Sequence, residues 1–184
     1  MSLSSFFYEI EIKSLLEWSL YSFLKKKLSN EYGWLKEEKN MSTQVFAPGR
    51  YTLRYNTDDV YVINKSERDR LCKKIEIEEI GRSGYPTKIR ELEKQGMRVV
   101  MEWDSSKDIY QTMYGDFMYE IHLESFPNWG QMLKVRYESK EKPNLEEHVL
   151  LMRKVAVDLG VDPIPPSQFK NRVSEYNKRF RYSS

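Results

Sequence analysis

Three ionisable residues alternate with bulky apolar residues near the N-terminus, in the sequence Tyr-Glu-Ile-Glu-Ile-Lys. Glu9, Glu11 and Lys13 are each two positions apart, and residues two apart on a β-strand point to the same side of a sheet. Two such carboxylates can ligate one Mg²⁺ or Mn²⁺ ion, since both ions prefer oxygen ligands. The neighbouring ammonium group can bind a phosphate oxygen, so the stretch is typical of a strand that carries phosphate chemistry on one face.

Four further segments show the same alternation, with one apolar face and one face rich in ionisable groups. Their polar faces hold Arg50, Thr52 and Arg54; Lys74, Glu76 and Glu78; Glu120, His122 and Glu124; and Met132, Lys134, Arg136 and Glu138. One interpretation is an open sheet whose charged face meets water. The other is a barrel of about eight strands, whose small interior is lined by the charged faces and suits a polyanion together with a divalent cation.

The segments that should position these residues are mostly strands. Strand alternation is found at 6–13, 41–46, 51–56, 59–65, 72–80, 97–103, 108–114, 116–126 and 131–139. Helices are expected at 14–28, at 86–96, at 144–159 and within the basic segment 162–180. The clearest of them has Asn144 as its N-cap and Gly160 as its stop.

Composition limits the classes of protein that fit. A chain of 184 residues without a composition shift predicts one domain, 1–184, and 30 basic against 28 acidic residues give no strong overall field. Cys72 cannot form an intramolecular disulfide, and one cysteine with two histidines is too few for a zinc site of the usual kind. No apolar run approaches the roughly 18 residues of a membrane span. We therefore expect a cytoplasmic protein without a membrane partner.

The N-terminal motif resembles the hallmark Glu-x-Glu-x-Lys strand of the CYTH superfamily, also called triphosphate tunnel metalloenzymes. Other segments resemble this family in the same order along nearly the whole chain. "YTLRYN" looks like its Leu-Arg-x-Arg strand, which places Arg54 at a phosphate-binding position. "VINK" looks like its Thr-x-Lys strand, which places Lys65, and Lys107 lies where the family has a Lys-x-Arg pair.

The resemblance implies an α+β fold, an eight-stranded antiparallel barrel that is closed or nearly closed, with helices packed outside. It implies catalytic roles for Glu9, Glu11 and Lys13, and a Mg²⁺ or Mn²⁺ ion held by Glu9 and Glu11 with Glu78 or Glu120, Glu138 being a further candidate. The ligand would be a triphosphate small molecule, a nucleotide or an RNA 5′ end. The residues that would bind it are Lys13, Arg54, Lys65, Lys74, Lys107, Lys134 and Arg136.

One departure from the family divides the functional interpretations. Lys134 and Arg136 stand where the family's closing strand usually has Glu-x-Glu, which reverses the charge. The first interpretation is an enzyme that hydrolyses a triphosphate or cyclises ATP with a divalent cation, on the model of class IV adenylate cyclases and thiamine triphosphatases. The second is a protein that binds a nucleotide, polyphosphate or RNA end without turnover. The third is an antiparallel sheet protein whose charged faces meet water and whose functional site lies in another part of the chain. For the oligomeric state, we expect either a monomer or a homodimer.

Structural roles are expected for the two histidines. His122 could ligate a metal beside Glu120 and Glu124, although a polar residue satisfied within the strand is the favoured interpretation. His148 is expected on the surface of its helix.

Overall fold

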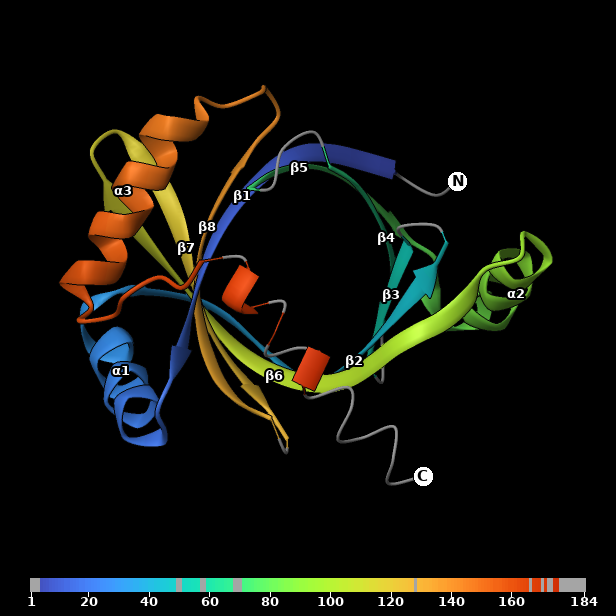
Figure 1. Ribbon diagram of the computed structural model, residues 1–184, viewed down its shortest axis with the longest axis horizontal. Helices are drawn as coiled ribbons and strands as arrows, with labels where there is room; N and C mark the ends of the chain where they lie inside the picture. The colour runs from blue at the N-terminus through green and yellow to red at the C-terminus, as the bar shows by residue number, and fades with distance from the viewer. Residues whose placement is uncertain are drawn as a thin grey trace.

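Eight antiparallel strands form a closed barrel in the computed structural model of the protein, in the order β1-β5-β4-β3-β2-β6-β7-β8 (Figure 1). The structure describes residues 4–48, 51–56, 59–67, 71–127, 129–165, 167–169, 171 and 174–175. The strands are β1 (Ser4–Leu16), β2 (Gly33–Ala47), β3 (Tyr51–Tyr55), β4 (Val60–Glu67), β5 (Cys72–Glu79), β6 (Arg98–Tyr114), β7 (Phe117–Phe126) and β8 (Gly130–Ser139). The helices are α1 (Trp18–Glu31), α2 (Gly81–Lys94) and α3 (Leu145–Asp158). The predicted fold class is confirmed.

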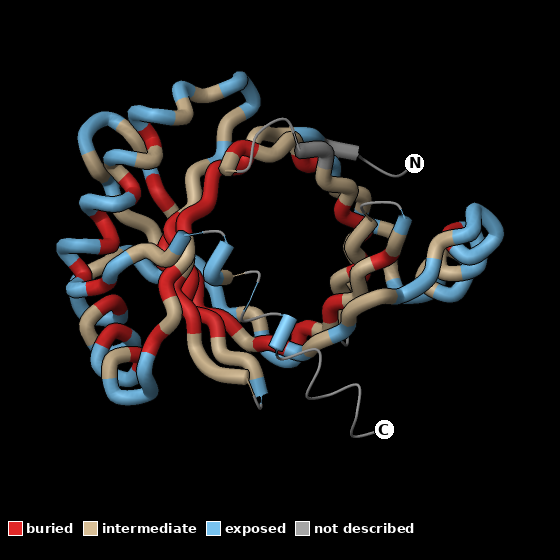
Figure 2. Tube along the Cα trace, in the orientation of Figure 1, coloured by how far each residue is buried: buried red, intermediate tan, exposed pale blue. Residues whose placement is uncertain are grey.

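Two hydrophobic cores lie outside the ring of strands, where the apolar strand faces meet the helices (Figure 1). The larger core joins α1 and α3 to the outer faces of β1, β7 and β8, and Ile10, Ile121, Leu133, Leu24 and Met152 are fully buried in it. Figure 2 shows buried residues concentrated on this side of the ring. Because the apolar faces are used outside, the charged faces of these strands point into the barrel.

The smaller core lies on the opposite side of the ring, under α2. Phe46, Leu53 and Val62 from β2, β3 and β4 pack against Leu92 of α2. The helix begins earlier than expected, at Gly81 instead of Pro86, so it includes residues 81–85, which were assigned to neither a strand nor a helix.

Helix α3 lies where it was expected, whereas α1 is shifted toward the C-terminus at both ends, from the expected 14–28 to Trp18–Glu31. In α3, the Asn144 side chain accepts a hydrogen bond from the N–H of Glu147, and Gly160 adopts φ +76° after the last turn, so the predicted cap and stop are confirmed. Helix α1 begins at Trp18 because Ser14, Leu15 and Leu16 continue β1 and pair with β8.

Two strands are longer than expected. Strand β2 spans 15 residues instead of the predicted 41–46, and β6 joins the two segments expected at 97–103 and 108–114 into 17 residues. The β2–β6 pairing contains register shifts, one of them between Glu38 and Met41, where Asn40 adopts φ 51° and donates its N–H to the Ser106 hydroxyl.

A short part of the C-terminal region lies against the barrel. The N–H of Ile164 donates to the carbonyl of Lys13 at 2.8 Å, and Lys13 Nζ lies 4.3 Å from the centre of the Phe169 ring. The helix expected within 162–180 falls mostly outside the described residues. None of the helices in the described part of the chain has the length and apolar character needed to cross a lipid bilayer.

Candidate functional site

The interior of the barrel is a cavity of about 620 Å³ lined by alternate residues of all eight strands. Strand β1 contributes Phe7, Glu9, Glu11 and Lys13. The other acidic, basic and histidine lining residues in the described chain are Lys36, Glu38, Arg54, Lys65, Lys73, Lys107, Glu120, His122, Glu124, Lys134, Arg136 and Glu138. The period of two that relates Glu9 to Lys13 therefore brings charges from many strands into one enclosed space.

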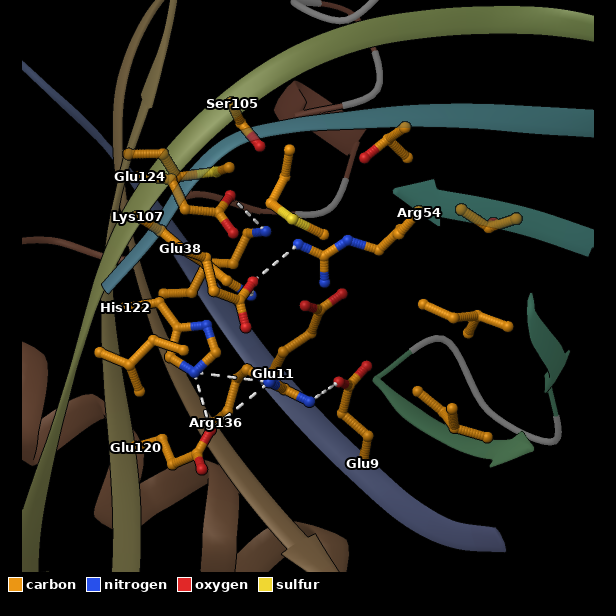
Figure 3. Close-up of a pocket in the computed structure, with 18 of the residues that line it drawn as sticks. Glu9, Glu11, Glu38, Arg54, Ser105, Lys107, Glu120, His122, Glu124 and Arg136 are labelled. Carbon is orange, nitrogen blue, oxygen red and sulfur yellow. Dashed lines mark hydrogen bonds and ion pairs between the residues drawn. The ribbon is translucent and has the colours of Figure 1, made fainter. Parts of the chain in front are cut away.

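Arg136 is the centre of the densest group in this cavity (Figure 3). Its guanidinium forms ion pairs with Glu9 of β1 and Glu138 of β8, and its Nη1 lies 3.4 Å from Glu120 Oε2 and 3.4 Å from His122 Nε2 on β7. His122 Nε2 is in turn 2.7 Å from Glu120 Oε2. We call Arg136, Glu9, Glu120, Glu138 and His122 the arginine cluster.

The strand pairing explains why this cluster forms. Strand β8 lies between β1 and β7, and Arg136 is paired across β8 with Glu11 on one side and Glu120 on the other. Glu9 is paired with Glu138, one step along the same two strands. Side chains directly opposite or diagonal across a pair of strands are within reach of one another, so three carboxylates converge on one guanidinium.

A second group surrounds Glu38 on the neighbouring part of the wall. Glu38 Oε2 lies 3.0 Å from Lys107 Nζ and 3.3 Å from Arg54 Nη2, and Glu38 Oε1 lies 2.7 Å from Lys36 Nζ. Figure 3 shows Glu38 and Arg54 pointing toward each other across the cavity. One carboxylate therefore holds three cations that come from three strands.

The two remaining buried carboxylates of the cavity are also paired with cations. Glu11 Oε1 lies 2.9 Å from Lys13 Nζ and 2.8 Å from Lys73 Nζ, and Glu124 Oε2 lies 2.5 Å from Lys134 Nζ. Burial alone would raise the pKa of Glu11 and Glu124, but these lysines outweigh it and hold both pKa values below their usual range. Both side chains are therefore anions at neutral pH.

Burial and charge also set the pKa values in the group around Glu38 and in the arginine cluster. Burial acts to raise the pKa of Glu38, but Lys107, Lys36 and Arg54 lower it to about 2. Burial and the nearby Arg54 lower the pKa of Lys107 to about 8. Burial and Arg136 lower the pKa of His122 well below its usual value, so its imidazole is neutral.

Solved structures with the same fold are known, although no protein-family model and no curated protein matches the chain. The PH1012 protein from Pyrococcus horikoshii OT3 is 19% identical with a TM-score of 0.66, over 86% of this chain and 94% of that one. A "putative adenylate cyclase" from Vibrio parahaemolyticus is 17% identical with a TM-score of 0.66, over 91% and 98% of the two chains. A "putative adenylate cyclase" from Bacillus halodurans is 10% identical with a TM-score of 0.54, over 85% and 92%. At these identities the comparisons establish a shared fold.

The barrel brings most of the predicted site residues together. The cavity is lined by Glu9, Glu11, Lys13, Arg54, Lys65, Lys107, Glu120, Lys134 and Arg136. Arg50 lies outside the described residues.

The predicted roles of Lys74 in ligand binding and of Glu78 in metal binding are wrong. Strand β5 turns the opposite face toward the cavity from the one expected. Lys73, Ile75 and Ile77 line the cavity. Lys74 Nζ lies 3.5 Å from Glu76 and 4.6 Å from the centre of the Phe6 ring, and Glu78 accepts a hydrogen bond from Lys88 of α2. The register with β1, which sets Lys73 opposite Glu9, decides which face of β5 is internal.

Sequence reasoning missed Lys36, Glu38 and Lys73, and misplaced His148. Lys36 and Glu38 are two positions apart, a spacing that could have indicated a shared strand face, but their segment was interpreted as a loop. The His148 ring is buried, stacked 3.7 Å from the Tyr137 ring, with its Nδ1 3.0 Å from the Tyr119 hydroxyl. His122 lies in the strand interior with polar partners, in agreement with the favoured interpretation.

The arrangement does not fit a divalent cation. In the described part of the chain, no group of three or more histidine, cysteine, aspartate or glutamate side chains is arranged to hold a metal ion. Glu9, Glu120, Glu138 and His122 do converge, but the guanidinium of Arg136 lies among them. One carboxylate oxygen of this cluster, the buried Oε1 of Glu9, has no hydrogen-bond partner among the described residues. It lies 3.8 Å from Lys65 Nζ.

Proposed function

We propose that the barrel binds the phosphate groups of a triphosphate-containing ligand, either a small molecule or a nucleotide. The observation that carries this proposal is the set of lysine and arginine side chains that converge on one enclosed cavity. Its volume of about 620 Å³ is within the range of about 300–1,000 Å³ that is typical of ligand pockets.

The charge balance of the cavity favours an anion. Eight basic and six acidic side chains line it in the described chain, an excess of two positive charges. The basic residues are Lys13, Lys36, Arg54, Lys65, Lys73, Lys107, Lys134 and Arg136, and the acidic ones are Glu9, Glu11, Glu38, Glu120, Glu124 and Glu138. Because the wall is closed and partly desolvated, this excess acts more strongly on a ligand than it would on an open surface.

The two kinds of cation would bind phosphate differently. Arg54 can present two parallel N–H donors to a phosphate, whereas the lysines act as point charges that adjust to a chain of phosphate groups. Lys65 approaches Glu9 only to 3.8 Å, so it is well placed to turn toward a ligand.

An apolar part of the wall suits a ligand that carries a ring. Phe126, Trp129, Met132 and Phe169 line the cavity, and the Trp129 ring lies 5.0 Å from Phe126 and 6.1 Å from Phe169. Aromatic faces of this kind stack on bases and other flat rings. This group supports a nucleotide over inorganic triphosphate.

Turnover is the second candidate, as hydrolysis of the triphosphate or cyclisation of ATP. It is supported by the sequence resemblance to the CYTH superfamily and by the name "putative adenylate cyclase" given to two proteins with this fold. The pairing of Glu9 with Arg136 speaks against the metal-dependent form of this chemistry, because it places a cation of the chain on the carboxylate that would ligate the metal.

A binding and product panel tests both candidates. Calorimetric titration with tripolyphosphate, ATP, thiamine triphosphate and a 5′-triphosphate RNA should give saturable binding for at least one of them. In the same samples, phosphate and pyrophosphate are measured with Mg²⁺, with Mn²⁺ and with chelator, for wild type and Glu9→Gln. Binding without product supports a binding protein, and product that requires Glu9 supports an enzyme. If none of the four ligands binds, the proposed function is wrong.

A further inference from the structure

The arginine cluster has the composition of a cation site whose cation is part of the chain. Glu9, Glu138 and Glu120 come from three adjacent strands, and each has a carboxylate oxygen on the guanidinium of Arg136. His122 completes the group with its Nε2 at 3.4 Å from Nη1 of Arg136. Three carboxylates and a neutral imidazole are also a ligand set that would suit a divalent metal ion.

We infer that Arg136 takes the place of a divalent cation in this barrel, so that the cavity binds its phosphate ligand without metal. The inference rests on the proposed function for the ligand, but its statement about the cation concerns this chain alone. Arg136 is then the residue that decides metal dependence.

Burial and charge support this role. Burial acts to lower the pKa of Arg136, but Glu9, Glu138 and Glu120 outweigh it and raise the pKa above the usual arginine value, so the guanidinium keeps its charge at every accessible pH. A metal ion at the same carboxylates would have to approach within a few ångströms of this fixed positive charge, in a medium that screens charges poorly. The tethered guanidinium also competes at a high effective concentration, as any group linked to its own site does.

Arg136 also reduces the negative charge that the three carboxylates present to a phosphate ligand. Without Arg136, Glu9, Glu120 and Glu138 would leave three negative charges close together on one part of the wall. With Arg136 in place, one of these three charges is compensated within the cluster, and Lys65 Nζ lies 3.8 Å from the Oε1 of Glu9. The lysines that line the same cavity, Lys65 among them, then supply the positive charge that faces a ligand.

Mn²⁺ alone gives the first test, with the free-ion signal in electron paramagnetic resonance as the readout. Wild-type protein should leave the Mn²⁺ signal unchanged. Arg136→Ala should bind one Mn²⁺ per chain, and Glu120→Gln in the Arg136→Ala background should lose it. Arg136→Lys is the matched control, because it keeps a cation among the carboxylates and should bind no Mn²⁺.

Two outcomes of this test overturn the inference. One is Mn²⁺ binding by wild type that Glu9→Gln removes. The other is a folded Arg136→Ala protein, judged by circular dichroism, that binds no Mn²⁺. Should Arg136→Ala fail to fold, the wild-type titration and the ligand titration below still decide the matter.

Tripolyphosphate binding gives the second test and separates the two proposals. The affinity of wild type in chelator should agree with that in Mg²⁺ to within about twofold, that is within about 0.4 kcal/mol. Binding that appears only with Mg²⁺ overturns the inference and leaves the proposed function intact. Absence of binding under both conditions, and for the rest of the ligand panel, overturns the proposed function, while the Mn²⁺ titration still decides the role of Arg136.

Discussion

Lys107 Nζ lies 3.0 Å from Glu38 Oε2, and the two residues are paired directly across β6 and β2 inside the barrel. Lys107 is almost fully buried, and burial together with Arg54 brings its pKa to about 8. An ammonium group with such a pKa loses its charge within the range of pH in which proteins are studied. The pair therefore links the anion affinity of the cavity to pH.

Phosphate affinity should fall as pH rises through about 8. A bound anion favours the protonated Lys107, so the contribution of this residue is fully present below its pKa of about 8 in the free protein and declines as pH rises above that value. Tripolyphosphate affinity is measured by calorimetry from about pH 6.5 to about pH 9.5, on either side of that pKa, for wild type and Lys107→Met.

The ratio of the two affinities cancels the ionisation of the ligand itself. It should be largest at the acidic end and fall toward the alkaline end, because Lys107 loses its charge there and a methionine side chain cannot ionise. A ratio that stays constant across the range would contradict a pKa near 8 for Lys107.

Of the two neighbouring lysines on β5, only Lys73 should contribute to ligand affinity. Lys73 lines the cavity and binds Glu11 at 2.8 Å, whereas Lys74 contacts Glu76 and Phe6 on the other face. Lys73→Ala should weaken tripolyphosphate binding by about tenfold, or roughly 1.4 kcal/mol, and Lys74→Ala should change it by less than about twofold. Equal effects of the two substitutions would show that a ligand does not reach the interior face of β5.

Strand alternation predicted the interior face of β1 correctly but not that of β5. On β1 the charged residues Glu9 and Glu11 alternate with Ile10 and Ile12, so only one assignment keeps the isoleucines in the core. On β5 both faces mix charged and apolar residues, and the apolar Ile75 and Ile77 line the cavity. Local sequence cannot decide between two such faces, because the register with β1 decides it.

Glu38 was not predicted to line the cavity for a different physical reason. The shift in pairing between Glu38 and Met41 interrupts the period of two, so that Lys36 and Glu38 line the cavity out of step with Met41 and Thr43. A bulge adds one residue to one strand, and no periodic pattern survives it. The interior faces of β1, β7 and β8, in contrast, follow from regular alternation, whereas Lys65 and Lys107 were placed by the resemblance to a known family.

Stability should depend on the outer core and not on the exposed face of α3. Met152 is fully buried in the larger core, whereas Leu150, two residues away on the same helix, is largely exposed. Met152→Ala should lower the free energy of unfolding by about 2–5 kcal/mol, and Leu150→Ala should change it by no more than about 0.5 kcal/mol. Urea unfolding monitored by circular dichroism measures both, and a small effect at Met152 would mean that α3 is not packed on the barrel as described.

His148 should make the fold less stable as pH falls below neutrality. Its ring is buried between aromatic side chains, and its Nδ1 faces the Tyr119 hydroxyl, whose pKa burial raises to about 12. Burial lowers the pKa of His148 below its usual value, with Glu147 as an opposing influence. The unfolded chain therefore binds a proton that the folded chain does not, and stability rises with pH between the lowered pKa and about 6.5.

The expected slope from this one group is at most about 1.4 kcal/mol per pH unit. Urea unfolding at several pH values between about 5 and 7.5 should show a smaller slope for His148→Gln than for wild type, because glutamine does not ionise there. His122, whose pKa is also lowered, keeps part of the slope in this variant. Tyr119→Phe is the matched control, since it removes the hydrogen bond to Nδ1 and leaves the titrating ring in place. An unchanged slope in His148→Gln would show that this imidazole is not held neutral by the fold.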